Sequence, residues 1–130
     1  MTLPSSRPPP REAGTELLVL SKFEAFTGWL FDRTASWPKS ARFTLTQRIE
    51  NHALDVVEDL VVARYQPGER RARLAAVNLR LERLRHLFRL ARTAGACPFT
   101  VFESSMRAID EAGRMVHGWR SGAATPIEGA

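Results

Sequence analysis

The chain has 130 residues, a net charge of +5 and a single cysteine, Cys97, so an intramolecular disulfide is excluded. No apolar run approaches the ~18 residues of a membrane span, and the N-terminus lacks the apolar segment of a signal peptide. These features predict a soluble, cytoplasmic protein that does not enter a membrane.

Both ends of the chain are predicted to be disordered. Residues 1–14 form a proline-rich leader with a PPP run, and residues 121–130 form a tail of small and polar residues. The segment between them, 15–120, is predicted to fold as one domain. It is long enough to bury a core without metal or disulfide bonds.

The first two predicted helices lie on either side of a proline-bearing connection. The first spans about Thr15–Ala35, and its apolar residues recur at helical spacing: Leu17, Leu20, Phe23, Phe26, Leu30 and Phe31. Pro38 ends it. Thr44 and Gln47 have the spacing of a capping box, which predicts a second helix from there to about Tyr65. Its apolar stripe is Leu45, Ile49, Ala53, Val56, Leu60 and Ala63.

The last two predicted helices repeat their apolar residues at nearly heptad spacing. The third runs from about Glu69 to Ala94, before Gly95 at the C′ position, with the stripe Leu74, Val77, Leu81, Leu84, Phe88 and Ala91. The fourth starts near Pro98, with Thr100 and Glu103 as a second capping box. Its stripe is Phe99, Phe102, Met106, Ile109, Gly113 and Val116. Four such helices with short connections predict an all-α, antiparallel up-down-up-down four-helix bundle.

Arginine is concentrated in the third predicted helix. Residues 69–92 hold eight arginines and two glutamates, a net charge of +6, which leaves −1 for the rest of the chain. A general codon bias toward arginine explains the 17 Arg against 2 Lys, but not this concentration. A solvated charged face is one interpretation. The other is a surface for an anionic partner, most simply a phosphate backbone.

Three leucines of the same helix lie behind its apolar stripe: Leu79, Leu87 and Leu90. A monomeric bundle would leave them exposed, and soluble proteins seldom leave contiguous apolar patches bare. They therefore predict a subunit interface, with scattered surface leucines as the alternative.

Three segments carry a resemblance to a known family. They are PKSARFTLTQRIENHALD at residues 38–55, LERLRHLFRLA at 81–91 and IDEAGRMVHGW at 109–119. In this order they resemble the accessory variability determinant family of diversity-generating retroelements, small four-helix-bundle proteins. The similarity spans about Leu17–Trp119. Thr46, where glycine is common, and Trp37 and His117 depart from the family pattern.

The resemblance implies a non-enzymatic accessory protein without a cofactor. Such proteins assemble as homopentameric barrels and bind the retroelement's reverse transcriptase and template RNA through a basic surface, in support of mutagenic cDNA synthesis. For this chain we expect the partner-binding residues to be arginines of the third helix: Arg71, Arg80, Arg83, Arg85, Arg89 and Arg92.

The alternative function is a plain oligomeric scaffold. It would be related to a group of four-helix bundles that share the fold and are encoded in insertions within ribosomal RNA genes. Under this alternative, the arginines of this chain would serve only to pair subunits, by contact with acids of the second helix. Catalytic and metal sites are not predicted. His52, His86 and His117 lie on three helices without carboxylates at ligand spacing, and Cys97 has no evident activating base.

Overall fold

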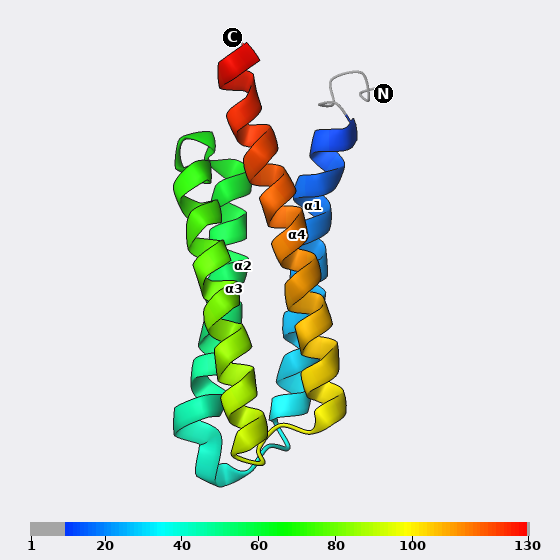
Figure 1. Ribbon diagram of the computed structural model, residues 1–130, viewed down its shortest axis with the longest axis vertical. Coiled ribbons are helices and arrows are strands. Elements are labelled where there is room, and N and C mark those ends of the chain that lie inside the picture. The colour runs from blue at the N-terminus through cyan, green and yellow to red at the C-terminus, as the bar shows by residue number, and fades with distance from the viewer. Residues whose placement is uncertain (1–9, 130) are drawn as a thin grey trace.

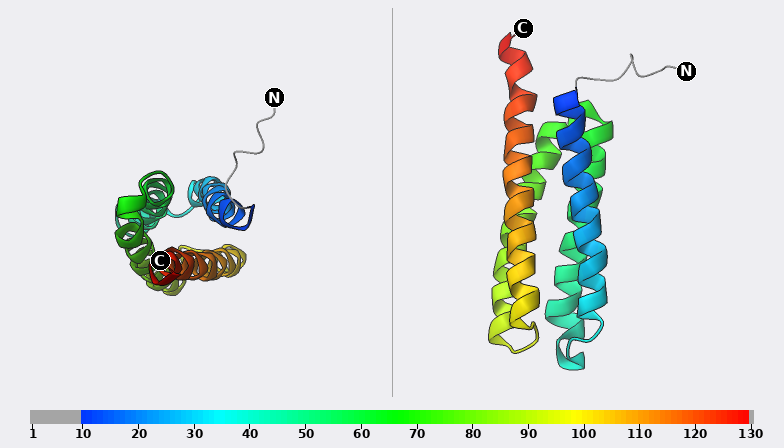
Figure 2. Two further views of the ribbon diagram at one scale, coloured as in Figure 1. Left: turned by 90° about the horizontal axis from the view of Figure 1, so that it is seen from above. Right: turned by 90° about the vertical axis from the view of Figure 1, so that its right-hand side faces the viewer.

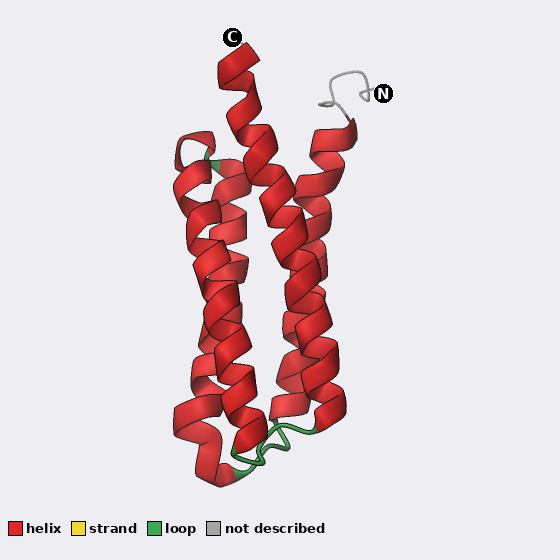
Figure 3. Ribbon diagram, viewed as in Figure 1, coloured by secondary structure: helices red, strands yellow, loops and turns green. Residues whose placement is uncertain are grey.

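The computed structural model describes the backbone of residues 10–129, and the side chains of residues 14 and 16–122. Four α-helices follow one another: α1 (Pro10–Thr34), α2 (Gln47–Tyr65), α3 (Arg70–Thr93) and α4 (Phe99–Gly129). Two short turns of other helix types, η2 (Lys39–Ala41) and η3 (Arg42–Thr46), connect α1 to α2, and η4 (Pro67–Glu69) connects α2 to α3. The described residues contain no strand (Figure 3).

Successive helices run in opposite directions and lie side by side (Figure 1). Contacts join α1 to α2, α2 to α3, α3 to α4, and α4 back to α1, so the helices surround one core, as the view from above shows (Figure 2). The contact between α2 and α3 is the most extensive. The prediction of an all-α antiparallel four-helix bundle is confirmed.

The apolar stripes predicted for α2 and α3 form the centre of the core. Every predicted α3 position is fully buried, as are the α2 positions from Ile49 to Ala63, while Leu45 at the start is half-buried. A strict 3-4 repeat of apolar residues keeps one stripe facing the neighbouring helix over the whole length, so the prediction from spacing was sufficient.

The stripes predicted for α1 and α4 are partly wrong. Leu17 and Phe31 of α1 are 47% and 38% exposed, and Val19 is buried instead. In α4, Phe99 is 54% exposed, and the buried positions are Val101, Ser105, Ile109, Ala112, Val116 and Trp119. Three of them, Val101, Ser105 and Ala112, directly precede the predicted positions Phe102, Met106 and Gly113 in the sequence, and they are small or medium-sized residues. They let α4 approach the core closely, while Phe102 and Met106 pack against its edge.

Neither predicted capping box forms. Thr44 lies inside η3, and its hydroxyl donates to the Ala41 carbonyl at 3.3 Å, while the Gln47 N–H bonds to the carbonyls of Arg42 and Thr44. Because helical turns lead directly into α2, its first N–H groups already have backbone acceptors. Thr100 lies within α4, where the Phe102 N–H bonds to the Pro98 carbonyl at 3.0 Å.

The end of α3 follows the prediction for Gly95. This residue has φ +77°, and its N–H bonds to the Arg92 carbonyl at 3.0 Å. The Ala96 N–H bonds to the Ala91 carbonyl at 2.9 Å. The two bonds form a Schellman motif, in which a left-handed residue reverses the chain after a helix.

Helix extends further at both ends than the sequence indicated. Helix α1 already begins at Pro10, within the predicted leader, and α4 continues to Gly129 through the predicted tail. Ala123 and Ala124 have the highest helix propensity of any residue type, so the backbone hydrogen bonds of α4 can continue beyond the bundle. Residues 1–9 of the predicted leader lie outside the described residues, and the limits 15–120 for the domain stay a prediction.

Candidate nucleic-acid interface

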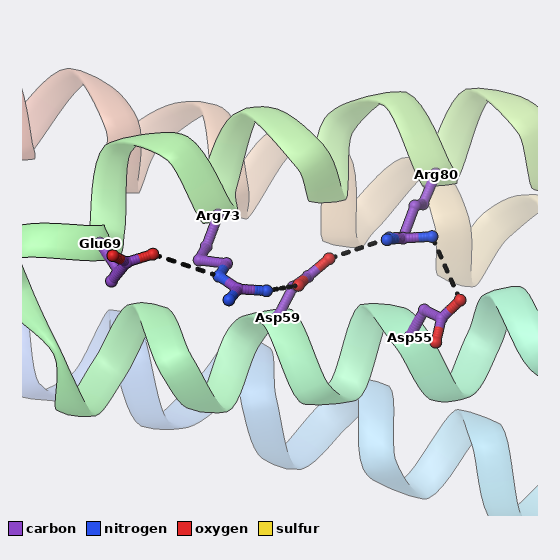
Figure 4. Close-up of polar contacts among 5 residues, drawn as sticks. All are labelled: Asp55, Asp59, Glu69, Arg73 and Arg80. Carbon is purple, nitrogen blue, oxygen red and sulfur yellow. Dashed lines mark hydrogen bonds and ion pairs between the residues drawn. The ribbon is translucent and has the colours of Figure 1, made fainter.

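The arginines of α3 that face α2 form a chain of ion pairs. Asp59 of α2, only 3% exposed, accepts hydrogen bonds from Arg73 Nη1 at 2.8 Å and from Arg80 Nε at 2.9 Å. Arg80 also donates from Nη1 to Asp55 at 3.1 Å, and Arg73 Nε lies 3.6 Å from Glu69 (Figure 4). Arg80, one of the predicted partner-binding residues, is therefore used within the chain.

Arg85 and Arg92 are likewise engaged, on the side of α3 that faces α4. Arg85 donates to Glu82 at 2.8 Å and, through Nε and Nη2, to one oxygen of Asp110 at 3.1 and 3.0 Å. Arg92 donates to the Cys97 carbonyl at 2.9 Å, and its guanidinium lies 5.4 Å from the centre of the Phe99 ring. Both side chains stabilise the packing of α3 against α4 and the connection between these two helices.

Three of the six predicted arginines remain available. Arg71, Arg83 and Arg89 are exposed and form no hydrogen bond or ion pair through their guanidinium groups with any side chain or backbone group in the described part of the chain. Arg71 and Arg89 are about five helical turns apart and share one side of α3, whereas Arg83 lies on the flank toward α2. The predicted set thus divides into structural and free arginines.

His52 of α2 lies among several charged residues of α2 and α3. It is half-buried, and its Nδ1 is buried without a hydrogen-bond partner among the described residues. Burial lowers the pKa of this imidazole, and the positive charges of Arg80, Arg83 and Arg48 lower it further. The carboxylate of Asp55 acts in the opposite direction on this pKa.

The predicted interface leucines have two different environments. Leu79 and Leu90 are 54% and 55% exposed, and their separation of about three helical turns places them on one face of α3. Leu87 is half-buried and packs against the core, so its contacts are at least partly within the subunit.

A second basic segment lies outside the set of partner-binding residues that was predicted from the sequence. Between Asp32 and Glu50 the chain carries four basic residues and no acidic one: Arg33, Lys39, Arg42 and Arg48. At its centre, in η3, the Phe43 side chain is 80% exposed, the highest value among the exposed large hydrophobic residues. The absence of acids over this stretch was the signal that could have identified it.

The described residues offer no metal site and no activated nucleophile. No group of three or more His, Cys, Asp or Glu in this part of the chain is placed to hold a metal ion. Cys97 is buried, and burial raises the pKa of its thiol to about 11, so the reactive thiolate is scarce near neutral pH. None of the helices described combines the length and apolar character needed to cross a bilayer.

The fold and the surface together define a small antiparallel four-helix bundle with free arginines on one outer helix. A model of the bAvd-like family, the bacterial accessory variability determinants, matches residues 17–122, and the chain belongs to this family. Its members are accessory proteins of diversity-generating retroelements, in general without catalytic activity. Searches among curated proteins and among solved structures gave no match. The resemblance noted in the sequence is confirmed.

Proposed function

We propose that this protein is the accessory subunit that binds the reverse transcriptase and template RNA of a retroelement and supports mutagenic cDNA synthesis. The observation that carries the proposal is the pattern of ion pairs on α3. Acidic neighbours hold Arg73, Arg80 and Arg85, yet Arg71 and Arg89 stay exposed with no acidic partner in the described residues. Free guanidinium groups suit bidentate contact with phosphate.

The free arginines are arranged for an extended partner. About 18 residues of helix separate Arg71 from Arg89, a rise of roughly 27 Å. A polyanion can contact both ends of such a surface at once, whereas a small anion cannot. Arg83 adds a free guanidinium group on the neighbouring flank of α3, the one toward α2. An RNA strand laid along α3 fits this arrangement.

The functional form in this proposal is a homo-oligomer, a pentamer as in the family, with Leu79 and Leu90 at the contact between subunits. Both leucines lie on the outer face of α3, more than half exposed. Burying them against a second subunit would remove apolar surface from water, at about 25 cal/mol per Å². Light scattering coupled to size-exclusion chromatography measures the subunit number. Glutamate at both positions is expected to reduce it, and the matched change Leu17→Glu on α1 is not.

The alternative function, a scaffold in which α3 arginines pair with α2 acids of another subunit, has less support. Asp55 and Asp59 already bind Arg80 and Arg73 of the same chain. A swap between subunits would have to break these contacts and re-form them without gain. Of the acids on α2, Glu58 is exposed and without a described partner, and Glu50 is half-buried and accepts a hydrogen bond from Thr34, so only these two could pair with another subunit without breaking an ion pair.

RNA affinity measured against salt concentration tests the proposed function. Binding through phosphates releases counterions, so the logarithm of the affinity falls linearly with the logarithm of salt concentration, by about 0.7 per phosphate contact for a single strand. Replacing Arg71, Arg83 and Arg89 together by alanine is expected to reduce this slope by about 2. The matched control is Arg107→Ala, an exposed arginine on α4, which changes the net charge but not the α3 surface. A salt-independent or absent affinity of the wild type contradicts the proposal.

A further inference from the structure

The turn η3 exposes an aromatic ring in a basic setting. Ala41 and Thr46, 7% and 1% exposed, both face inward and are about one π-helical turn apart. Phe43, midway between them, is therefore turned to the outside, 80% exposed. A π-helical turn holds one residue more than an α-turn and is frequent at functional sites. The backbone geometry of η3 sets the direction of this ring.

The Phe43 ring makes no aromatic or cation–π contact with any described residue. The aromatic contacts of the described residues include Phe99, which stacks near Phe102 and lies under Arg92, but none involves Phe43. Tyr65, the other strongly exposed aromatic at 67%, has Arg64 over its ring at 5.2 Å. Phe43 differs from these rings because it is 80% exposed and no aromatic ring or guanidinium group of a described residue lies against it.

The charged residues of the chain segment around Phe43, from residue 33 to residue 49, are all basic. Lys39 and Arg42 have no ion-pair or hydrogen-bond partner for their charged groups within the described ranges. The nearest acid further along the chain, Glu50, is half-buried and already accepts a hydrogen bond from Thr34 at 2.6 Å. A positive, aromatic and unobstructed surface is complementary to a nucleic-acid strand with unpaired bases, which offers π-faces and phosphates together.

We propose that Phe43 is a stacking platform for an unpaired base of RNA, with Lys39 and Arg42 binding the flanking phosphates. This inference rests on the proposed function, since it names the kind of RNA structure that the accessory protein recognises at the η2–η3 end of the bundle. Duplex RNA keeps its bases stacked on each other and cannot use the platform. The site therefore selects single-stranded segments, whereas the α3 arginines bind either form.

The test compares four versions of the full chain: the wild type and the variants Phe43→Ala, Phe43→Leu and Phe43→Trp. Each is titrated with an unstructured RNA oligonucleotide that contains 2-aminopurine, and with a duplex of the same sequence. Loss of base–aromatic stacking, worth ~1–3 kcal/mol per base, is expected to weaken single-strand binding about 5- to 150-fold for alanine and leucine. Phe43→Trp retains the affinity, and duplex binding stays the same in all four.

Salt dependence separates the ring from the charges. The Phe43 variants are expected to leave the salt slope unchanged, whereas Lys39→Ala and Arg42→Ala each reduce it by about 0.7. The matched control is Tyr65→Ala, which removes an exposed ring at the other end of α2 and is expected to change no affinity. Because Phe43 is exposed, urea denaturation midpoints of its variants should equal that of the wild type.

Three outcomes overturn the inference. If Phe43→Leu binds single strands like the wild type, the contact is apolar and not stacking. If Phe43→Ala weakens duplex and single-strand binding equally, or changes the subunit number, the ring serves the assembly. If all variants bind like the wild type, the platform does not exist while the proposed function stands. If the wild type shows no salt-dependent RNA binding, both the stacking platform and the proposed function are contradicted.

Discussion

Arg80 of α3 donates its Nε hydrogen to Oδ2 of Asp59 on α2 at 2.9 Å, across the most extensive helix contact of the bundle. Arg73 donates to the other oxygen of the same carboxylate. A carboxylate that is only 3% exposed is costly unless its charge is compensated, and these two guanidinium groups compensate it. Part of the basic character of α3 therefore serves the fold.

Replacing Asp59 by asparagine is expected to destabilise the protein by ~1–3 kcal/mol, because the negative charge and one of the two acceptor oxygens that bind Arg73 and Arg80 are lost at a buried position. Urea denaturation measures the change. The matched control is Asp110→Asn, whose carboxylate also binds an arginine but has a side chain that is 53% exposed. There we expect a loss below ~1 kcal/mol, since solvent screens an exposed pair. Equal losses at the two positions would show that burial of Asp59 is not the reason for its effect.

The left-handed conformation of Gly95 gives a second prediction. No atom lies within 4 Å of a Cβ added there, so Gly95→Ala meets only the backbone cost of φ +77°, about 1–2 kcal/mol. The matched control is Gly28→Ala in the middle of α1, where the added Cβ is equally free and the helical backbone favours alanine. That change is expected to raise stability by ~0.5–1 kcal/mol. Thermal or urea denaturation should show shifts of opposite sign, and two shifts of the same sign contradict the argument.

The burial of a residue could be predicted from the sequence where the spacing of apolar residues within its own helix determines it, but not where the packing of neighbouring helices does. The stripes of α2 and α3 were correct from Ile49 to Ala91 because spacing alone fixes which side of a helix is apolar. In α4 large and small apolar residues occupy adjacent stripes, and the choice of Ala112 over Gly113 as a buried position depends on how closely α1 and α3 approach. Spacing does not contain that information.

The basic charge of the candidate site could be predicted from the sequence, but which arginines are free to bind a partner could not. The excess of arginine in α3 is visible in the sequence, yet only the register of α3 against α2 and α4 shows that Asp59 and Asp110 neutralise Arg80 and Arg85. Phe43 was missed for a similar reason. Its exposure follows from the π-helical turn, and the Thr44/Gln47 spacing had indicated an ordinary helix start instead.

Cys97 is expected to resist alkylation while the protein is folded. Its pKa of about 11 leaves little thiolate at pH 8, and the side chain is only 1% exposed. Iodoacetamide at pH 8 should modify it slowly in native buffer and rapidly in urea, as followed by the mass of the intact protein. Equal rates in the two conditions would mean that the α3–α4 connection opens readily.

Stability is expected to fall at mildly acidic pH because of His52. Its pKa in the folded protein lies below the ordinary value of 6.5, so below that pH the unfolded chain binds a proton that the folded chain does not. The free energy of unfolding therefore decreases as the pH falls through 6.5, and no such change occurs above it. Denaturation midpoints between pH 7.5 and about 5 measure the effect.

The variant His52→Gln isolates the contribution of this imidazole, because glutamine does not titrate. It should flatten the pH dependence over the same interval. Carboxylates change protonation mainly at lower pH and affect both proteins alike. A wild type and a His52→Gln variant with parallel profiles would show that His52 is solvated in both states.

The difference between Arg85 and Arg89 gives the sharpest separation of structural from partner-binding arginines. Arg85→Glu places a third carboxylate beside Glu82 and Asp110 and removes their hydrogen bonds, so we expect a loss of ~1–2 kcal/mol of stability. Arg89→Glu changes an exposed side chain without a described partner, so its stability should stay within ~0.5 kcal/mol of the wild type.

RNA binding by the two variants should respond in the opposite order. Arg89→Glu is expected to lower both the affinity and the salt slope, the slope by at least ~0.7, whereas folded Arg85→Glu keeps most of the slope. Urea denaturation measures the stability of the two variants, and salt-dependent titration measures their RNA binding. Because the two substitutions change the net charge equally, each variant is the control for the other. If Arg85→Glu loses more of the slope than Arg89→Glu, the ion pairs of Arg85 are exchanged for phosphate when RNA binds, and the division of α3 into structural and free arginines is wrong.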